Sequence, residues 1–79
     1  MSKLRVTFTF TGSLIQEPII WQLSQKFRVK TNIRRADVGD DVGWVTLELE
    51  GEESDIQQGV EWVRSTGTQV DLVTGDVVE

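Results

Sequence analysis

The sequence predicts an α+β domain assembled from two strand–helix units on either side of a β-hairpin. Strict apolar–polar alternation over residues 3–10 predicts the first strand, and a second alternating stretch over residues 28–51 predicts the hairpin. Apolar residues spaced by three and four predict a helix before the hairpin and another after it. The resulting β-α-β-β-α-β order is that of the ferredoxin-like fold, in which both helices cover one face of a four-stranded antiparallel sheet.

The first strand and first helix carry clear core-facing patterns. In the strand, the expected core side chains are Leu4, Val6, Phe8 and Phe10. Pro18 is predicted to open the helix, because proline lacks the N–H that would be unpaired in a first turn. The helix is predicted to run to about Phe27, with Ile20 and Leu23 facing the core and Trp21 flanking it.

The hairpin is predicted to place alternate residues of each strand in the core. Val29, Thr31, Ile33 and Arg35 alternate with Lys30, Asn32, Arg34 and Ala36, so Ile33 is expected in the core. The connector VGDDVG supplies glycine and aspartate where the chain must reverse. In the second hairpin strand the alternating apolar residues are Val45, Leu47 and Leu49. The first hairpin strand and the C-terminal strand are predicted to form the two sheet edges.

The second helix is predicted over residues 55–65, with Ser54 as its N-cap and Gly67 just past its end. Gly59 lies on its apolar face, where we expect it to let the first helix approach closely. The last strand is predicted over residues 69–73. The sequence therefore predicts one domain over residues 1–74, followed by an acidic tail at residues 75–79.

Composition argues against several classes of function. The formal net charge of −5 opposes binding to nucleic acid or to an anionic membrane. The chain has no Cys and no His, which removes thiolate metal sites and the commonest general base. We therefore expect no enzyme activity, no metal and no cofactor. Lacking a signal-peptide pattern and a long apolar run, the chain is expected to be soluble and cytoplasmic.

The sheet face opposite the helices is expected to be polar and without cover from this chain. Thr7, Thr9, Thr46 and Glu48 are predicted to lie on it, with Trp44 at one end. Water can cover such a face, and so can a second copy of the chain. Nearby, the basic run Lys26–Arg35 is interpreted as a charged edge strand that discourages aggregation.

Around Asn32-Ile33, inside this topology, the chain resembles the NIL domain, named for an Asn-Ile-Leu run on its second strand. Supporting motifs in the same order are Phe10-Thr11-Gly12, Glu17-Pro18-Ile19-Ile20, Phe27-Arg28-Val29, Gly43, Leu47 to Gly51, Gly59-Val60-Glu61-Trp62-Val63 and Val70-Asp71-Leu72-Val73. This resemblance covers nearly the whole chain. Arg34 departs from the leucine of the family pattern, and the chain looks like a stand-alone form of the domain.

The resemblance implies a regulatory domain that binds methionine or a related amino acid at the interface of a homodimer. Asn32 falls on the signature asparagine, and an amide can pair with an amino acid's carboxylate or amine. On the same face, Arg34 either binds a carboxylate or pairs with Glu48, and Trp44 is expected to contact the ligand's side chain. A strand-edge Asn32 bonded to backbone or water is an equally acceptable interpretation.

The sequence leaves two other hypotheses open. In the first, the domain is an adapter without a small ligand, and its sheet face or its basic Lys30–Arg35 edge docks a transporter or redox protein. A weaker hypothesis is binding of single-stranded nucleic acid, which requires salt-sensitive affinity.

Overall fold

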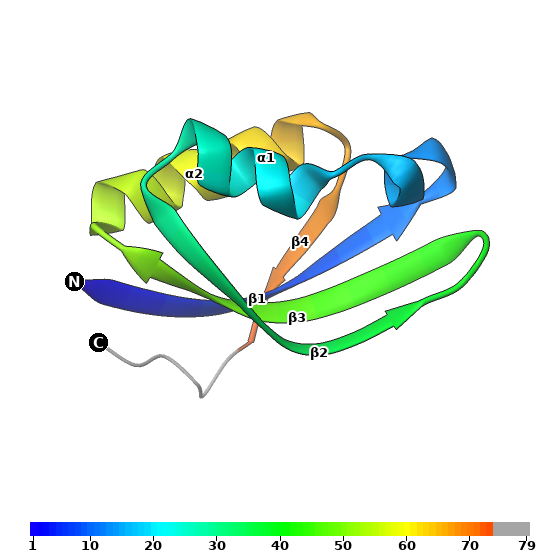
Figure 1. The fold of residues 1–79 in the computed structure, drawn as a ribbon, viewed down its shortest axis with the longest axis horizontal. Helices are drawn as coiled ribbons and strands as arrows, with labels where there is room; N and C mark the ends of the chain where they lie inside the picture. Colours follow the sequence, from blue (N-terminus) through cyan, green and yellow to red (C-terminus); the bar gives the residue numbers. More distant parts are fainter. Residues whose placement is uncertain (74–79) are drawn as a thin grey trace.

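The computed structural model describes residues 1–73 and has the predicted order of elements. In chain order these are β1 (Ser2–Thr11), the 3₁₀ helix η1 (Gly12–Gln16), α1 (Ile19–Lys26), β2 (Val29–Val38), β3 (Val42–Gly51), α2 (Glu53–Ser65) and β4 (Gln69–Leu72). The strands form one antiparallel sheet in the order β2-β3-β1-β4. Both helices lie on the same side of the sheet (Figure 1), which confirms the ferredoxin-like α+β fold.

The core lies between this sheet and the two helices. Val6, Phe8 and Phe10 of β1 are buried, and β1 is the strand that pairs with both β3 and β4. The period-two pattern of β1 and β3 thus places one row of each central strand against the helices. The remaining buried apolar side chains are Ile19, Leu23, Val29, Val45, Leu47, Leu49, Ile56, Val60 and Val63.

The two helices pack closely at Gly59, as the sequence predicts. A Cβ atom built on Gly59 would lie 2.7 Å from Cδ1 of Leu23, which is fully buried on α1. Beside this contact Phe27 and Trp62 pack with their ring centroids 6.3 Å apart. Gly67 follows the end of α2 with φ of +96°, so its predicted place after the helix is confirmed.

The helix starts differ from the sequence predictions. Helix α1 begins at Ile19, with Pro18 as the non-helical residue before it, and a 3₁₀ helix occupies the segment expected to be a connector. Helix α2 begins at Glu53, two residues before the predicted start, so the prediction of Ser54 as N-cap is wrong. The extended Glu52 takes that position, and its carbonyl accepts the N–H of Ile56. Glu53 and Asp55 in the first turn suit the positive end of the helix dipole.

A β-bulge in β2 overturns the predicted alternation of the hairpin. The pairing with β3 runs regularly to Ile33 opposite Leu47 and resumes with Arg35 opposite Thr46, so Arg34 is the extra residue. Arg35 therefore lies on the outer face rather than beside Ile33. Ile33 does point to the helix side, but its side chain is 55% exposed because it lies on an edge strand. The prediction that Ile33 is a core residue is wrong.

No helix among residues 1–73 is long and apolar enough to cross a membrane. The predicted acidic tail at residues 75–79 lies outside the described residues.

Candidate functional site at the outer face and β2 edge

The outer face of the sheet brings together the residues that the sequence assigns to an interface. Thr7 and Thr46 lie opposite each other on β1 and β3, and their hydroxyl oxygens are 2.9 Å apart. Next to them, Arg5 donates a 2.7 Å hydrogen bond from Nη2 to Oε2 of Glu48. Thr9 lies opposite Trp44. These side chains are half-buried within the single chain, and they tie the two central strands together.

Glu48 is a carboxylate that is held in its charged form. The hydrogen bond from Arg5 lowers the pKa of Glu48, and the positive charges of Arg34, Arg5 and Lys3 add to this effect, while partial burial opposes it. The cation that forms the ion pair with Glu48 is Arg5, on the neighbouring strand, rather than Arg34. Arg34 contributes to the site through its electric field on Glu48.

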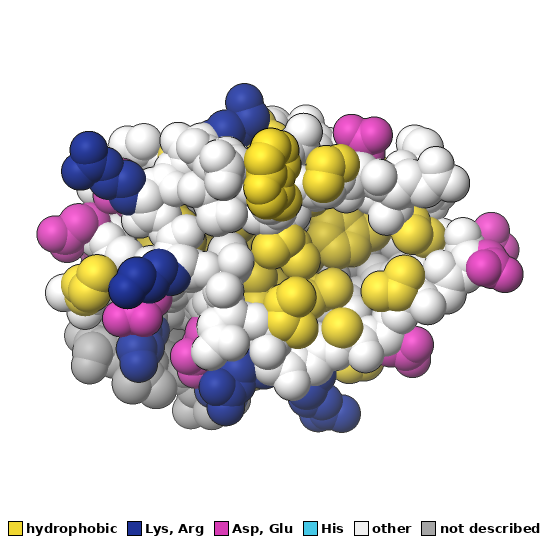
Figure 2. All heavy atoms as spheres, viewed as in Figure 1, with side chains coloured by type: hydrophobic (Ala, Val, Ile, Leu, Met, Phe, Trp, Pro, Cys, Tyr) yellow, Lys and Arg dark blue, Asp and Glu magenta, His cyan; other side chains and the backbone are white. Residues whose placement is uncertain are grey.

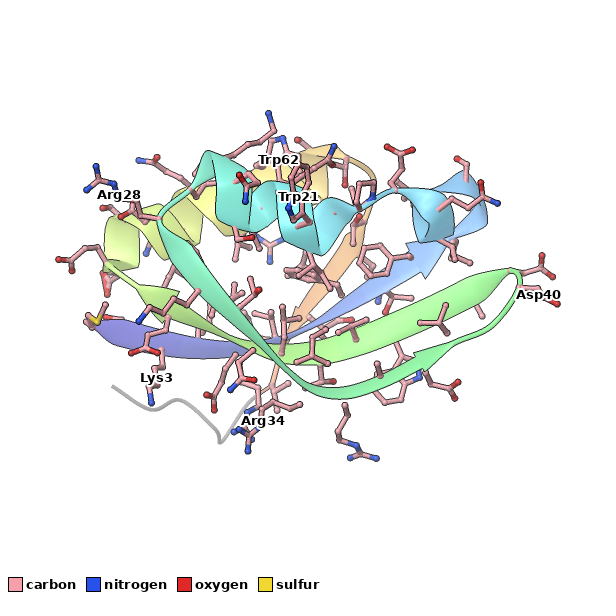
Figure 3. The ribbon with its side chains drawn as sticks, in the orientation of Figure 1. Lys3, Trp21, Arg28, Arg34, Asp40 and Trp62 are labelled. Atoms are coloured by element: carbon pink, nitrogen blue, oxygen red, sulfur yellow. The ribbon has the colours of Figure 1, made fainter. Side chains whose placement is uncertain are left out.

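Asn32 and Arg34 occupy the edge strand β2 beside this carboxylate. Asn32 lies directly opposite Glu48 in the β2–β3 pairing, and both Asn32 and Arg34 are exposed. Arg34 extends from β2 on the side away from the helices (Figure 3). The structure therefore brings Asn32, Arg34 and Glu48 to one face of the sheet, with an amide, a cation and an anion next to each other.

Trp44 lies further along the same face and is half-buried. It pairs across β3 with Thr9 on one side and Asp37 on the other. The guanidinium carbon of Arg35 lies 6.0 Å from the Trp44 ring centroid, in range of a cation–π contact. Strict alternation assigned Arg35 to the other face, so sequence reasoning missed this neighbour. Only the bulge, which the hydrophobic pattern does not mark, brings Arg35 to Trp44.

A second feature, an apolar groove, lies on the helix side between α1 and the end of the β2–β3 hairpin. It has a volume of about 200 Å³, and its lining includes Leu14, Ile15, Ile20, Trp21, Val38 and Val45. Hydrophobic side chains gather there, below α1 and above the hairpin (Figure 2). Trp21 is 61% exposed on this rim rather than packed at the core margin as expected. The sequence did contain a signal for this groove. Trp21 lies off the apolar stripe of its helix, and Val38 is an apolar residue just before the hairpin turn.

The outer face offers hydrogen-bonding, charged and aromatic side chains. No group of three or more His, Cys, Asp or Glu residues in this part of the chain is placed to hold a metal ion. The outer-face cluster combines a hydrogen-bonding amide, fixed charges of both signs and an aromatic ring. Such a set complements a small zwitterion that carries an apolar side chain.

The chain matches known proteins over most of its length. Residues 4–72 match the model of the NIL domain. The methionine import ATP-binding protein MetN of Vibrio vulnificus strain YJ016 is 28% identical over 86% of this chain. MetN of Mannheimia succiniciproducens is 29% identical over 86% of the chain. The chain spans 21% of the length of these two relatives.

Solved structures share the fold. The C-terminal domain of an ABC transporter ATP-binding protein from Enterococcus faecalis superposes with a TM-score of 0.78 at 21% identity, covering 92% of this chain and 86% of that one. The de novo designed protein Ferredog-Diesel superposes with a TM-score of 0.56 at 20% identity, covering 92% of this chain and 85% of the design.

Proposed function

The chain belongs to the NIL domain family, and from this premise we propose that it is a regulatory domain that binds methionine or a related small amino acid at the interface of a homodimer. The curated relatives are methionine import ATP-binding proteins, which supports methionine as the first ligand to test. The observation that carries the proposal is Asn32, at the position of the family's signature asparagine, on the same sheet face as Arg34 and opposite Glu48.

The groups around Asn32 suit the two charged ends of a free amino acid. The guanidinium of Arg34 complements a carboxylate, and the ionised carboxylate of Glu48 complements an ammonium group. Asn32 lies next to both and can donate to one group and accept from the other. Trp44 offers an apolar surface on the same face for the side chain of the ligand.

The ligand acts in this proposal as a regulator and not as a substrate. The absence of His and Cys from the sequence removes the usual nucleophile–base pairs, so we propose a non-catalytic domain. Its similarity to ATP-binding proteins of methionine import supports a cytoplasmic location in this proposal. A ligand at a subunit interface shifts the pairing of subunits only by its differential affinity for the two states. Methionine would therefore regulate by favouring one arrangement of the two copies.

Equilibrium dialysis of labelled L-methionine against wild type and Asn32→Ala tests this assignment. We expect the substitution to weaken binding about tenfold or more, because one hydrogen bond to a charged group is worth about 1.5–3 kcal/mol. Gln58→Ala, which removes an exposed amide from α2, is the matched control and should bind as wild type does. Equal affinity of the wild type and Asn32→Ala would exclude the role proposed for Asn32.

An adapter function is the second candidate, favoured by the exposure of Lys30, Arg34 and Arg35 on an edge strand. In this function the basic edge docks an acidic surface of another protein, such as a transporter subunit or a redox protein. Charge reversal at Arg34 and Arg35 should then abolish capture of that partner. Capture that is insensitive to both reversals would exclude this edge as the docking site.

A further inference from the structure

Two groups of larger side chains lie on the outer face, one on each side of Thr7 and Thr46. The first group contains Glu48 and, opposite it, Asn32, whereas the second contains Trp44. Thr46 lies midway between Glu48 and Trp44 on β3, and its hydroxyl contacts the hydroxyl of Thr7 on β1. The short threonine side chains thus separate a charged end of the candidate site from an aromatic end.

The spacing of these two ends along β3 suits one extended amino acid. Glu48 and Trp44 are four positions apart, which in a β-strand corresponds to about 13 Å. By standard bond lengths, an extended methionine measures about 7 Å from its ammonium nitrogen to the end of its side chain. The side chains of Glu48 and Trp44 occupy the remaining distance. A ligand whose charged groups lie at Asn32 and Glu48 therefore brings the end of its side chain to Trp44.

Arg35 determines what the end of the ligand meets beside Trp44. Its guanidinium carbon lies 6.0 Å from the centroid of the Trp44 ring. Arg35 is exposed, and within residues 1–73 no ion pair or side-chain hydrogen bond engages its guanidinium. The contact with the ring uses the charge of the guanidinium, so its N–H donors stay available. The aromatic end of the site thus offers hydrogen-bond donors as well as apolar surface.

A ligand that ends in an apolar group leaves these donors without a partner. Binding displaces water from the guanidinium of Arg35, and a donor that loses its water costs free energy unless the ligand replaces it. The thioether of methionine is only a weak acceptor. An oxygen atom at the end of the ligand restores the lost hydrogen bond, so it should strengthen binding.

Asp37 restricts the charge of this oxygen acceptor. It lies opposite Trp44 in the β2–β3 pairing, so the aromatic end already carries one cation, Arg35, and one anion. A carboxylate on the ligand side chain would be attracted by Arg35 and repelled by Asp37. A neutral acceptor gains the hydrogen bond from Arg35 without this repulsion.

We propose that the site selects an amino acid whose side chain is as long as that of methionine and ends in a neutral oxygen acceptor, to which Arg35 donates. A sulfoxide and a primary amide both have this chemistry. The inference rests on the proposed amino-acid site and narrows its ligand. Asn32, Arg34 and Glu48 bind the ammonium and carboxylate groups that all amino acids share. Arg35 is the residue that determines specificity.

Calorimetric titration with each ligand in turn tests this selection. The two sulfur epimers of L-methionine sulfoxide add one oxygen to methionine, L-glutamine supplies an acceptor without sulfur, and L-norleucine has none. We expect the better sulfoxide epimer to bind about tenfold or more tightly than L-methionine, since the new hydrogen bond has a charged donor. L-norleucine should show no such gain, and L-glutamate should bind less tightly than L-glutamine. A gain for L-glutamine as well would extend the selection from sulfoxides to amides.

Arg35→Leu should bind L-methionine nearly as the wild type does and should lose the preference for the sulfoxide. Arg35→Lys keeps a charged donor and should retain part of the preference. Arg64→Leu, which removes an exposed arginine from α2, is the matched control and should keep all of it.

The outcomes separate this inference from the proposed function. Binding of L-methionine without a gain for any acceptor ligand would overturn the selection and leave the proposed function standing. A gain that persists in Arg35→Leu would overturn the role of Arg35. If none of these amino acids binds, the proposed function fails, and this inference fails with it.

Discussion

Arg5 of β1 donates a 2.7 Å hydrogen bond to Glu48 of β3 at the centre of the outer sheet face. Both side chains are only 20–25% exposed, so the pair is better sheltered from solvent than an ordinary surface ion pair. It leaves Arg34, one strand away, to act on other groups. In the proposed recognition of an amino acid, Arg5 therefore holds Glu48, and Arg34 binds the carboxylate of the ligand.

The Arg5–Glu48 pair predicts a dependence of stability on acid pH. The pKa of Glu48 is lowered from 4.5, so its contribution is present above that value and is lost as pH falls through the lower folded-state pKa. Glu48→Gln should therefore show a shallower loss of unfolding free energy between about pH 5 and pH 3. Urea unfolding across this range measures it, and Glu61→Gln on α2 is the control. Equal slopes for wild type and Glu48→Gln would contradict the prediction.

The close approach of the helices predicts that Gly59→Ala destabilises the fold. Alanine favours a helix by about 1 kcal/mol over glycine, but its Cβ would lie 2.7 Å from Leu23 Cδ1. We expect a net loss of about 1–2 kcal/mol in unfolding free energy, since overpacking costs about 1–3 kcal/mol. Gln58→Ala, at an exposed position of the same helix, should not lose stability. In the background of Leu23→Ala, Gly59→Ala should lose its penalty, and full additivity would contradict the contact.

The proposed role of Arg34 predicts that the protein prefers ligands that carry a carboxylate. The wild type should bind L-methionine more tightly than L-methioninamide, which lacks the carboxylate, by about tenfold or more. Arg34→Gln should weaken L-methionine and leave L-methioninamide nearly unchanged, which removes the preference. Competition dialysis gives both affinities, with Arg64→Gln as the control. A preference that survives in Arg34→Gln would assign the carboxylate to another residue.

The fold was predictable because its signals are local and regular. The alternation in β1 and β3 fixed which side chains are buried, and Gly59 and Gly67 marked a helix contact and a helix end that the structure confirms. The start of α2 was placed two residues late, since Glu52 and Glu53 compete with Ser54 for the helix start and short-range signals of similar strength do not separate them.

The candidate site was predictable only in part. The hydrophobic rows of β1 and β3 predict which face of the sheet each residue lies on, so Thr7, Thr46 and Glu48 could be assigned to the outer face from the sequence. The edge strand β2 has one neighbour and few buried residues to fix its phase, so the bulge at Arg34 was not visible in the sequence. This one extra residue in β2 places Arg35 on the outer face, beside Trp44. The choice of Arg5 as the partner of Glu48 required the geometry of two paired strands.

Calorimetric titration of the purified protein with L-methionine, with L-alanine as the control, tests the central claim most directly. The account predicts saturable heat with L-methionine that exceeds the response to L-alanine and is lost in Asn32→Ala. The absence of any heat at about millimolar ligand, where a binding free energy of about −4 kcal/mol would be visible, would contradict an amino-acid sensor and favour the adapter.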